Sequence, residues 1–232
     1  MIATARSPQR LAGLGVEIAE FADLPARVEP GALVLHSIPP EGPADVLRLL
    51  GGEPSRVVYL SSTAAYGVAE LVNETTDVSP DTERAEVRLA VERAVMNGPW
   101  SSLILRCAAI YGPGRGIHER VKRGEREFSG HIVSRIHVED LATHCEAALL
   151  SNVSGAYPVA DEEPASSWEV AQYSASLLGL PAPSEATATG STRLSGNRRV
   201  DGSAIRRALG ITLQYPSYRM GIPPLMRGIR VG

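Results

Sequence analysis

Short apolar runs alternate with amphipathic stretches along the first two thirds of the chain. The clearest run, residues 56–62 (RVVYLSS), has the composition and length of a buried strand. Residues 81–96 carry apolar side chains at a period of 3.6 residues, which predicts a helix that stops at Asn97-Gly98-Pro99. Strands and helices that alternate in this way form parallel sheets covered by helices. The sequence therefore predicts an α/β fold.

The other predicted elements follow the same pattern. Strands are expected at residues 1–5, 16–21, 32–37, 102–107 and 132–138. Helices are expected after Ser7-Pro8 and at residues 43–50, 139–150, 167–178 and 203–209. The segment 32–37 (ALVLHS) is apolar enough to be a strand buried on both faces.

The sequence pattern changes after residue 150. Residues 181–196 are rich in Pro, Ser, Thr and Ala, which predicts a mobile surface loop between two helices. We therefore expect a sheet domain at residues 1–150 and a small C-terminal lobe at residues 151–232 that packs on it.

Composition excludes several classes of protein. The net charge is −3 with acidic and basic residues interspersed, which argues against a nucleic-acid partner. No apolar run approaches the ~18 residues that a membrane span needs, and the first residues do not form a secretory signal. Two cysteines, Cys107 and Cys145, cannot build a disulfide framework for a chain of this size. We expect a cytoplasmic protein without a membrane partner.

A hydroxyl-rich segment follows the clearest strand. Ser61, Ser62 and Thr63 precede Ala64-Ala65-Tyr66-Gly67. Ligands of an open parallel sheet bind beyond the carboxyl ends of its strands, where such hydroxyl groups can face a cofactor. The alternative is that these hydroxyls only cap a turn, and this segment alone leaves both readings open.

Three further segments follow this one along the chain. They are Leu103-Ile104-Leu105-Arg106 running into Cys107-Ala108-Ala109-Ile110-Tyr111-Gly112-Pro113-Gly114, then Ser134-Arg135-Ile136-His137-Val138-Glu139-Asp140-Leu141-Ala142, then Tyr215-Pro216-Ser217-Tyr218-Arg219. Together the four segments resemble extended short-chain dehydrogenases/reductases of the NAD-dependent epimerase/dehydratase family. The resemblance extends from Met1 to about Gly221 and implies a Rossmann-like, doubly wound parallel sheet with a small C-terminal lobe.

The resemblance implies a set of catalytic positions, two of which depart from the family. The hydroxyl group that hydrogen-bonds the reacting sugar oxygen falls on Ser62. The family's Tyr and Lys, four residues apart on the long helix, fall on Arg84 and Arg88. Arg88 retains a charge that could hold a ribose, but Arg84 cannot replace a phenol because guanidinium keeps its proton. Tyr66 is the nearest other phenol and a candidate for proton transfer.

A glycine-rich loop that holds the cofactor pyrophosphate is also expected by resemblance and is missing from the sequence. Residues 1–6 resemble the family's second strand, with Arg6 near the adenosine ribose, so the first strand and its loop would precede Met1. Two explanations stay open: a shortened protein, or a start site placed inside a longer gene.

By resemblance, the cofactor is NAD or NADP and the substrate is a small molecule, with nucleotide sugars as candidates. The expected cofactor contacts are Arg6, His36, Ser37, Ile38, Ser61, Arg88, Cys107, Ala108 and Ile110. The expected substrate contacts are Thr63, Arg198 and Arg199.

Two hypotheses about activity remain. One is an oxidoreductase or isomerase that works by hydride transfer; the other is a non-catalytic relative that binds a ligand or a partner. The open strand edge left by the missing first strand also makes a homodimer a candidate state.

A metal site at His137, Asp140, His144 and Cys145 is the weaker alternative, because His144 and Cys145 are neighbours on a helix and point in different directions. We expect no metal.

Overall fold

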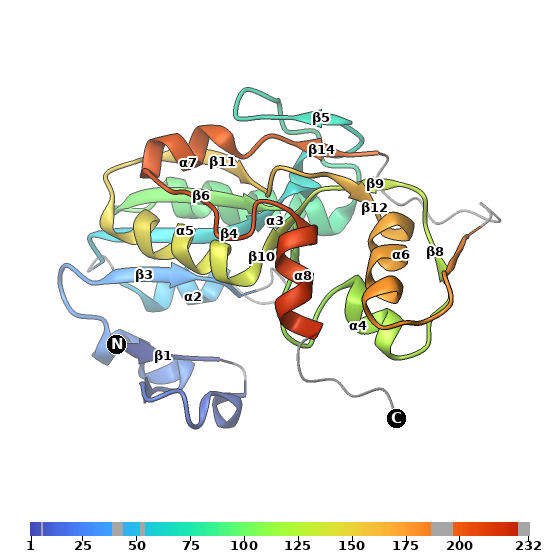
Figure 1. Ribbon diagram of the computed structural model, residues 1–232. Helices are drawn as coiled ribbons and strands as arrows, with labels where there is room; N and C mark the ends of the chain where they lie inside the picture. Colours follow the sequence, from blue (N-terminus) through green and yellow to red (C-terminus); the bar gives the residue numbers. More distant parts are fainter. Residues whose placement is uncertain (6, 39–43, 52–53, 187–196, 227–232) are drawn as a thin grey trace.

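A four-stranded parallel sheet forms the centre of the molecule (Figure 1). The computed structural model describes residues 1–5, 7–38, 44–51, 54–186 and 197–226. The strand order is β11–β6–β4–β3. The strands span β3 Leu33–His36, β4 Arg56–Ser62, β6 Ser101–Cys107 and β11 Gly155–Val159. The predicted α/β fold with a parallel sheet is confirmed.

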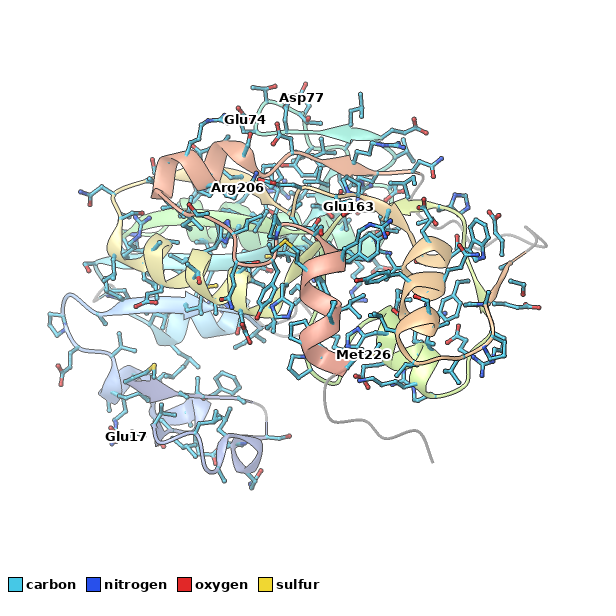
Figure 2. All side chains as sticks on the ribbon, viewed as in Figure 1. Glu17, Glu74, Asp77, Glu163, Arg206 and Met226 are labelled. Atoms are coloured by element: carbon cyan, nitrogen blue, oxygen red, sulfur yellow. The ribbon has the colours of Figure 1, made fainter. Side chains whose placement is uncertain are left out.

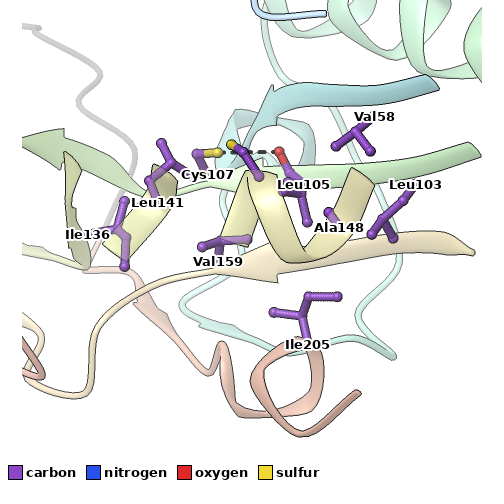
Figure 3. Close-up of a cluster of buried hydrophobic side chains, with 10 residues drawn as sticks. Val58, Leu103, Leu105, Cys107, Ile136, Leu141, Ala148, Val159 and Ile205 are labelled. Carbon is purple, nitrogen blue, oxygen red and sulfur yellow. Dashed lines mark hydrogen bonds between the residues drawn. The ribbon is translucent and has the colours of Figure 1, made fainter. Parts of the chain in front are cut away.

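Helices cover both faces of this sheet. They are α2 Ala44–Leu49, α3 Glu83–Met96, α5 Val138–Leu150 and α7 Ser203–Leu209. Successive strand side chains point to opposite faces, so Val57 and Tyr59 pack with α2 and α3. Val58 packs instead with α5 and α7, in the cluster that Figure 3 shows. This arrangement makes the sheet doubly wound, as the sequence predicts.

The edge strand β3 corrects one expectation. We predicted that residues 32–37 are buried on both faces, but Leu33 and Leu35 are 46% and 41% exposed. The reason is position: β3 pairs with β4 on one side only and has no described neighbour on the other. Its apolar composition therefore produces an exposed apolar edge.

The N-terminal segment forms a separate unit beside β3, at the lower left of Figure 1. Strands β1 Ile2–Ala3 and β2 Glu17–Ile18 pair with each other in parallel, and no described bond joins them to the central sheet. The segment continues through η1 Pro8–Leu11, η2 Phe21–Asp23 and α1 Leu24–Arg27. Val28 then packs against the cluster under α2 and α3. The two expected strands exist, but Arg6 lies outside the described residues.

A group of short elements flanks the sheet at the end where the strands stop. It contains η3 Thr63–Tyr66, β5 Leu71–Val72, β7 Ala109–Tyr111, α4 Ile117–Lys122, β8 Glu127–Phe128, β9 Ile132–Val133, β10 Arg135–His137, β12 Ala165–Ser166, α6 Ser167–Leu177, β13 Ser184–Glu185, β14 Arg199–Val200 and α8 Tyr218–Met226. Tyr111, Val170, Tyr218 and Ile222 belong to one of its buried clusters, with Met226 at the end of α8 (Figure 2).

The predicted boundary after residue 150 falls before a strand of the central sheet. We did not predict β11, which pairs with β6 along its whole length. The expected strand at residues 132–138 is instead divided into β9 and β10, and β10 pairs with β7. In the predicted loop at residues 181–196, residues 184–185 form β13, and residues 187–196 lie outside the described residues. No helix in the described part of the chain is long and apolar enough to cross a bilayer.

Candidate functional site

A cleft of about 470 Å³ lies at the carboxyl ends of β4 and β6. Parallel strands present their carboxyl ends on one edge of the sheet, and this edge is where open α/β sheets bind ligands. The cleft is lined by Ser37, Leu60, Ser61, Ser62, Thr63, Ala64, Arg84, Arg88, Cys107, Ala108, Ala109, Ile110, Arg115, Ile132, Val133, Ser134, Arg198 and Val200. None of these residues is acidic, so hydroxyl groups and guanidinium groups set its chemistry.

Ser62 stands where β4 ends and η3 begins. Its backbone is extended and its Oγ accepts a hydrogen bond from Ala64 N at 3.2 Å, so it is the N-cap of η3. The capping reading of this segment is therefore correct for Ser62. Because that bond uses the oxygen as an acceptor, the O–H can still donate to a molecule in the cleft.

The long helix α3 brings two arginines to the same cleft. It begins after Thr82, whose side chain accepts from Ala85 N at 3.2 Å. Arg84 and Arg88 are one turn apart and both line the cleft. Arg84 is exposed and Arg88 is half-buried. Ser62 and Arg88 therefore face a common cavity, as the family resemblance implies.

A buried polar network lies one hydrogen bond away from the cleft. Ser61 donates to Glu92 Oε1, and Glu92 accepts from Arg106 with 2.8 Å between Oε2 and Nη2. Arg106 Nη1 also donates to the Tyr66 hydroxyl at 3.2 Å. All four residues are buried, and each side chain is joined to another member by at least one of these hydrogen bonds. The network fixes the strand end that carries the cleft hydroxyls.

Tyr66 belongs to this network and does not line the cleft. It is 1% exposed, and burial raises the pKa of its hydroxyl, although hydrogen bonding from Arg106 opposes the shift. A buried phenol with a raised pKa is a poor proton donor or acceptor for a ligand outside. The structure therefore does not bring Tyr66 together with Ser62, contrary to the expectation of a catalytic phenol.

The residues expected along the cofactor divide into two groups. Ser37, Ser61, Cys107, Ala108 and Ile110 line the cleft. Burial raises the pKa of the Cys107 thiol, so this side chain is a packing group and not a nucleophile.

His36 and Ile38 do not line the cleft. His36 is buried against Tyr59, with ring centroids 4.8 Å apart, and burial lowers its pKa to about 4. The imidazole is therefore neutral near pH 7. His36 therefore packs against Tyr59 and does not line the cleft.

Arg198 and Arg199 are adjacent in the sequence, but only Arg198 lines the cleft. Arg198 lines the cleft, but its guanidinium donates to the carbonyl groups of Thr63 at 2.7 Å, Ala69 at 3.2 Å and Gly67. It holds the turn after β4 in place. Arg199 is exposed on β14, which pairs with β5, and lies outside the cleft. The expected pair of substrate contacts is not brought together.

The residues of the metal alternative have other partners. His137 caps α5 by accepting from Glu139 N at 3.3 Å. Asp140 accepts from the backbone N–H groups of Gln214 at 2.7 Å and Tyr215 at 3.0 Å, which fastens the C-terminal segment to α5. No group of three or more candidate ligands in the described part of the chain could hold a metal ion.

Sequence reasoning missed Arg115 and Ser134 as cleft residues. Arg115 sits in the loop Gly112-Pro113-Gly114-Arg115-Gly116, in which Gly114 and Gly116 have positive φ angles. An arginine in a loop that leaves the carboxyl end of β6 and β7 was the available signal.

Comparisons with known proteins support the fold. A functionally unknown conserved protein from Silicibacter pomeroyi is 31% identical, with a TM-score of 0.81 over 97% of this chain and 88% of that one. A Methylobacillus flagellatus protein assigned as an NAD-dependent epimerase/dehydratase is 24% identical, with a TM-score of 0.79 over the same shares. MoeE5, solved with UDP-glucuronic acid and NAD, is 22% identical, with a TM-score of 0.74 over 96% of this chain and 88% of that one.

A curated relative, the 3-diazoavenalumate denitrifying reductase of a Streptomyces species, is 31% identical over 159 residues. The match covers 61% of this chain and about half, 52%, of that protein. The sequence matches no family model.

The parallel sheet and its strand-end cleft define a Rossmann-like protein with the fold of the NAD-dependent epimerases/dehydratases and related short-chain dehydrogenases/reductases. Within that fold, the chain belongs to the same family as the Silicibacter pomeroyi protein.

Proposed function

We propose that the protein is an NAD(P)-binding oxidoreductase whose chemistry takes place in the cleft at the ends of β4 and β6. The observation that carries the proposal is that Ser62 and Arg88, from separate elements, line one cavity at the ligand-binding edge of a parallel sheet. The fold shared with an NAD-dependent epimerase/dehydratase and with MoeE5, solved with NAD, supports this cofactor.

The lining residues fit the nicotinamide half of such a cofactor. Ser37 offers a hydroxyl group, whereas the Ser61 hydroxyl can only accept because it donates to Glu92, and Arg88 brings a positive charge to the side of the cleft formed by α3. Among the described residues we find no glycine-rich loop of the family's spacing to hold the pyrophosphate, so this proposal assigns its oxygens to Arg84, which lines the cleft from α3. Bound NAD(P) would supply hydride transfer.

Ser62 has the clearest catalytic role. Its O–H can donate to a carbonyl or hydroxyl oxygen of a substrate, because its own oxygen is already held by Ala64 N. Arg88 can stabilise negative charge on that oxygen, but it cannot move a proton because guanidinium stays protonated. The proton therefore comes from water in this proposal.

Two substrate classes follow from different observations. MoeE5, solved with UDP-glucuronic acid, makes nucleotide sugars the first class to test. The reductase relative supports simple reduction of a small molecule.

The second candidate function is ligand binding without catalysis. It is favoured by α3, residues ERAEVRLAVERAVM, which contains neither tyrosine nor lysine. In this case the cleft would still bind NAD(P) or another anion, but no turnover would follow.

Titration of NADH and NADPH into the full chain, followed by nicotinamide fluorescence, tests both functions. We expect binding to wild type, about tenfold weaker binding to Arg88→Gln, and unchanged binding to Arg93→Gln, an exposed position on the same helix. If neither nucleotide binds, the oxidoreductase proposal is wrong. If they bind and no UDP-sugar, aldehyde or ketone is turned over, the binding function is the correct one.

A further inference from the structure

A second cavity of about 370 Å³ adjoins the cleft. The two share Ala109, Ile110, Arg115 and Val133. The second cavity extends away from the ends of the strands into the space between α4, α6 and α8. A molecule that reacts at Ser62 could therefore place its remaining atoms here.

The walls of this cavity are largely apolar. Ile117 comes from α4, Val170 from α6 and Ile222 from α8. Tyr111 and Tyr218 add two aromatic rings from the same buried cluster. Apolar and aromatic walls with a few polar groups are typical of sites for small organic ligands, and the volume lies within their ~300–1,000 Å³ range.

Positive charge is concentrated on this lining. Four arginines line the cavity and no acidic side chain does, among the described residues. Arg120 is neutralised by Glu125, with 2.7 Å between Nε and Oε2. Arg115 is exposed, and its side chain has no hydrogen-bond or ion-pair partner in the described part of the chain.

Arg135 is the most unusual of the four because it is a buried cation, only 4% exposed. Its Nη1 donates to the carbonyl groups of Val133 at 2.7 Å and Ala165 at 2.6 Å, and its Nη2 makes only a 3.5 Å contact with Ser167 Oγ. No described carboxylate forms an ion pair with it.

The carboxyl group with the largest electrostatic influence on Arg135 is that of Asp161. Burial raises the pKa of this carboxyl group to about 8, although Arg135 opposes the shift, so it is mostly protonated at neutral pH. A buried charge without a counter-ion is costly, and an anion in the cavity would reduce that cost.

We propose that the second cavity binds a small ligand with a flat apolar body and one carboxylate group, the chemistry of an aryl carboxylic acid. The apolar wall and the two tyrosine rings contact the body, while Arg115 and Arg135 pair with the carboxylate. As a statement of substrate class this inference rests on the proposed function; as a statement of binding it does not.

Calorimetric titration of the full chain with trans-cinnamate tests the site without any cofactor. Cinnamamide is the matched probe, since it has the same shape and no charge. We expect cinnamate to bind about tenfold or more tightly than cinnamamide, because an ionised acceptor strengthens hydrogen bonds from arginine. Equal binding of the two probes, or no binding of cinnamate, overturns the proposal.

Arg115→Gln locates the binding. This exposed side chain has no described partner, so its loss should leave the fold intact. We expect it to weaken cinnamate binding and to leave cinnamamide binding unchanged, with the remaining preference for cinnamate due to Arg135, whereas Arg93→Gln changes neither affinity. An unchanged affinity in Arg115→Gln, or displacement of cinnamate by UDP-glucose that binds more tightly, overturns the assignment. NADH binding is measured separately, so failure of the proposed function and failure of this inference can be told apart.

Discussion

Glu92 on α3 and Arg106 on β6 form a buried ion pair, with 2.8 Å between Oε2 and Nη2. Glu92 is fully buried and also accepts from Ser61 of β4, a residue that lines the cleft. The pair thus connects a helix and two strands of the sheet beside the proposed active site.

Replacement of Glu92 by Gln should therefore be strongly destabilising. It leaves the Arg106 charge buried without its partner, which typically costs about 3–5 kcal/mol. Urea unfolding measures the loss. Glu86→Gln, an exposed position on the same helix, is the control and should change the free energy of unfolding by less than about 0.5 kcal/mol. A similar small effect at both positions would contradict the importance of the pair.

Sequence patterns predicted this helix and these strands closely. The apolar period placed α3 within two residues, and the runs at residues 56–62 and 102–107 are β4 and β6. Such elements are predictable because burial imposes a regular period on their side chains. The pattern failed at β11, whose five residues, GAYPV, are too short and too weakly β-branched to stand out.

The site was predictable only in part. Ser62 and Arg88 line one cleft, and this placement was predictable because it depends only on the order of strand, turn and helix along the chain. The burial of Tyr66 outside the cleft was not predictable, because its hydroxyl is held by Arg106, which lies 40 positions away in the sequence. Likewise, sequence could not reveal that Arg198 uses its donors on the turn carbonyls.

The open edge at β3 predicts self-association. Leu33 and Leu35 are exposed on a strand that has no neighbour on one side among the described residues, and such edges tend to pair with another chain. The double variant Leu33→Lys, Leu35→Lys should remain monomeric at concentrations where the wild type forms dimers. Light scattering coupled to size exclusion measures the mass. A wild type that stays monomeric throughout would count against the homodimer prediction.

Asp161 predicts an unusual dependence of stability on pH. Burial raises its pKa from 3.8 to about 8, so between these values the folded protein binds more protons than the unfolded chain. Stability from this group is fully present below pH 4 and is lost as pH rises towards 8, at up to about 1.4 kcal/mol per pH unit.

Asp161→Asn should remove this slope. Its stability relative to wild type should increase from pH 5 to pH 8 and then stay level, as measured by urea midpoints at each pH. Asp77→Asn, at an exposed position, is the control and should show no such trend. A constant difference between wild type and Asp161→Asn across this range would show that the carboxyl group does not titrate there.

Gly67 lies in a tight turn after η3 that should not tolerate a larger side chain. It follows η3 with a φ of 53°, and a Cβ atom there would overlap the carbonyl oxygen of Ser79. Gly67→Ala therefore combines an unfavourable backbone conformation with a clash against rigid backbone, and we expect a loss of about 3 kcal/mol or more. Gly179→Ala is a close control, because its φ is 65° but its Cβ would meet nothing within 4 Å. That change should cost only the conformational part, about 1–2 kcal/mol. Thermal and urea unfolding of both variants separate the two effects, and equal losses would mean that the turn can move away from Ser79.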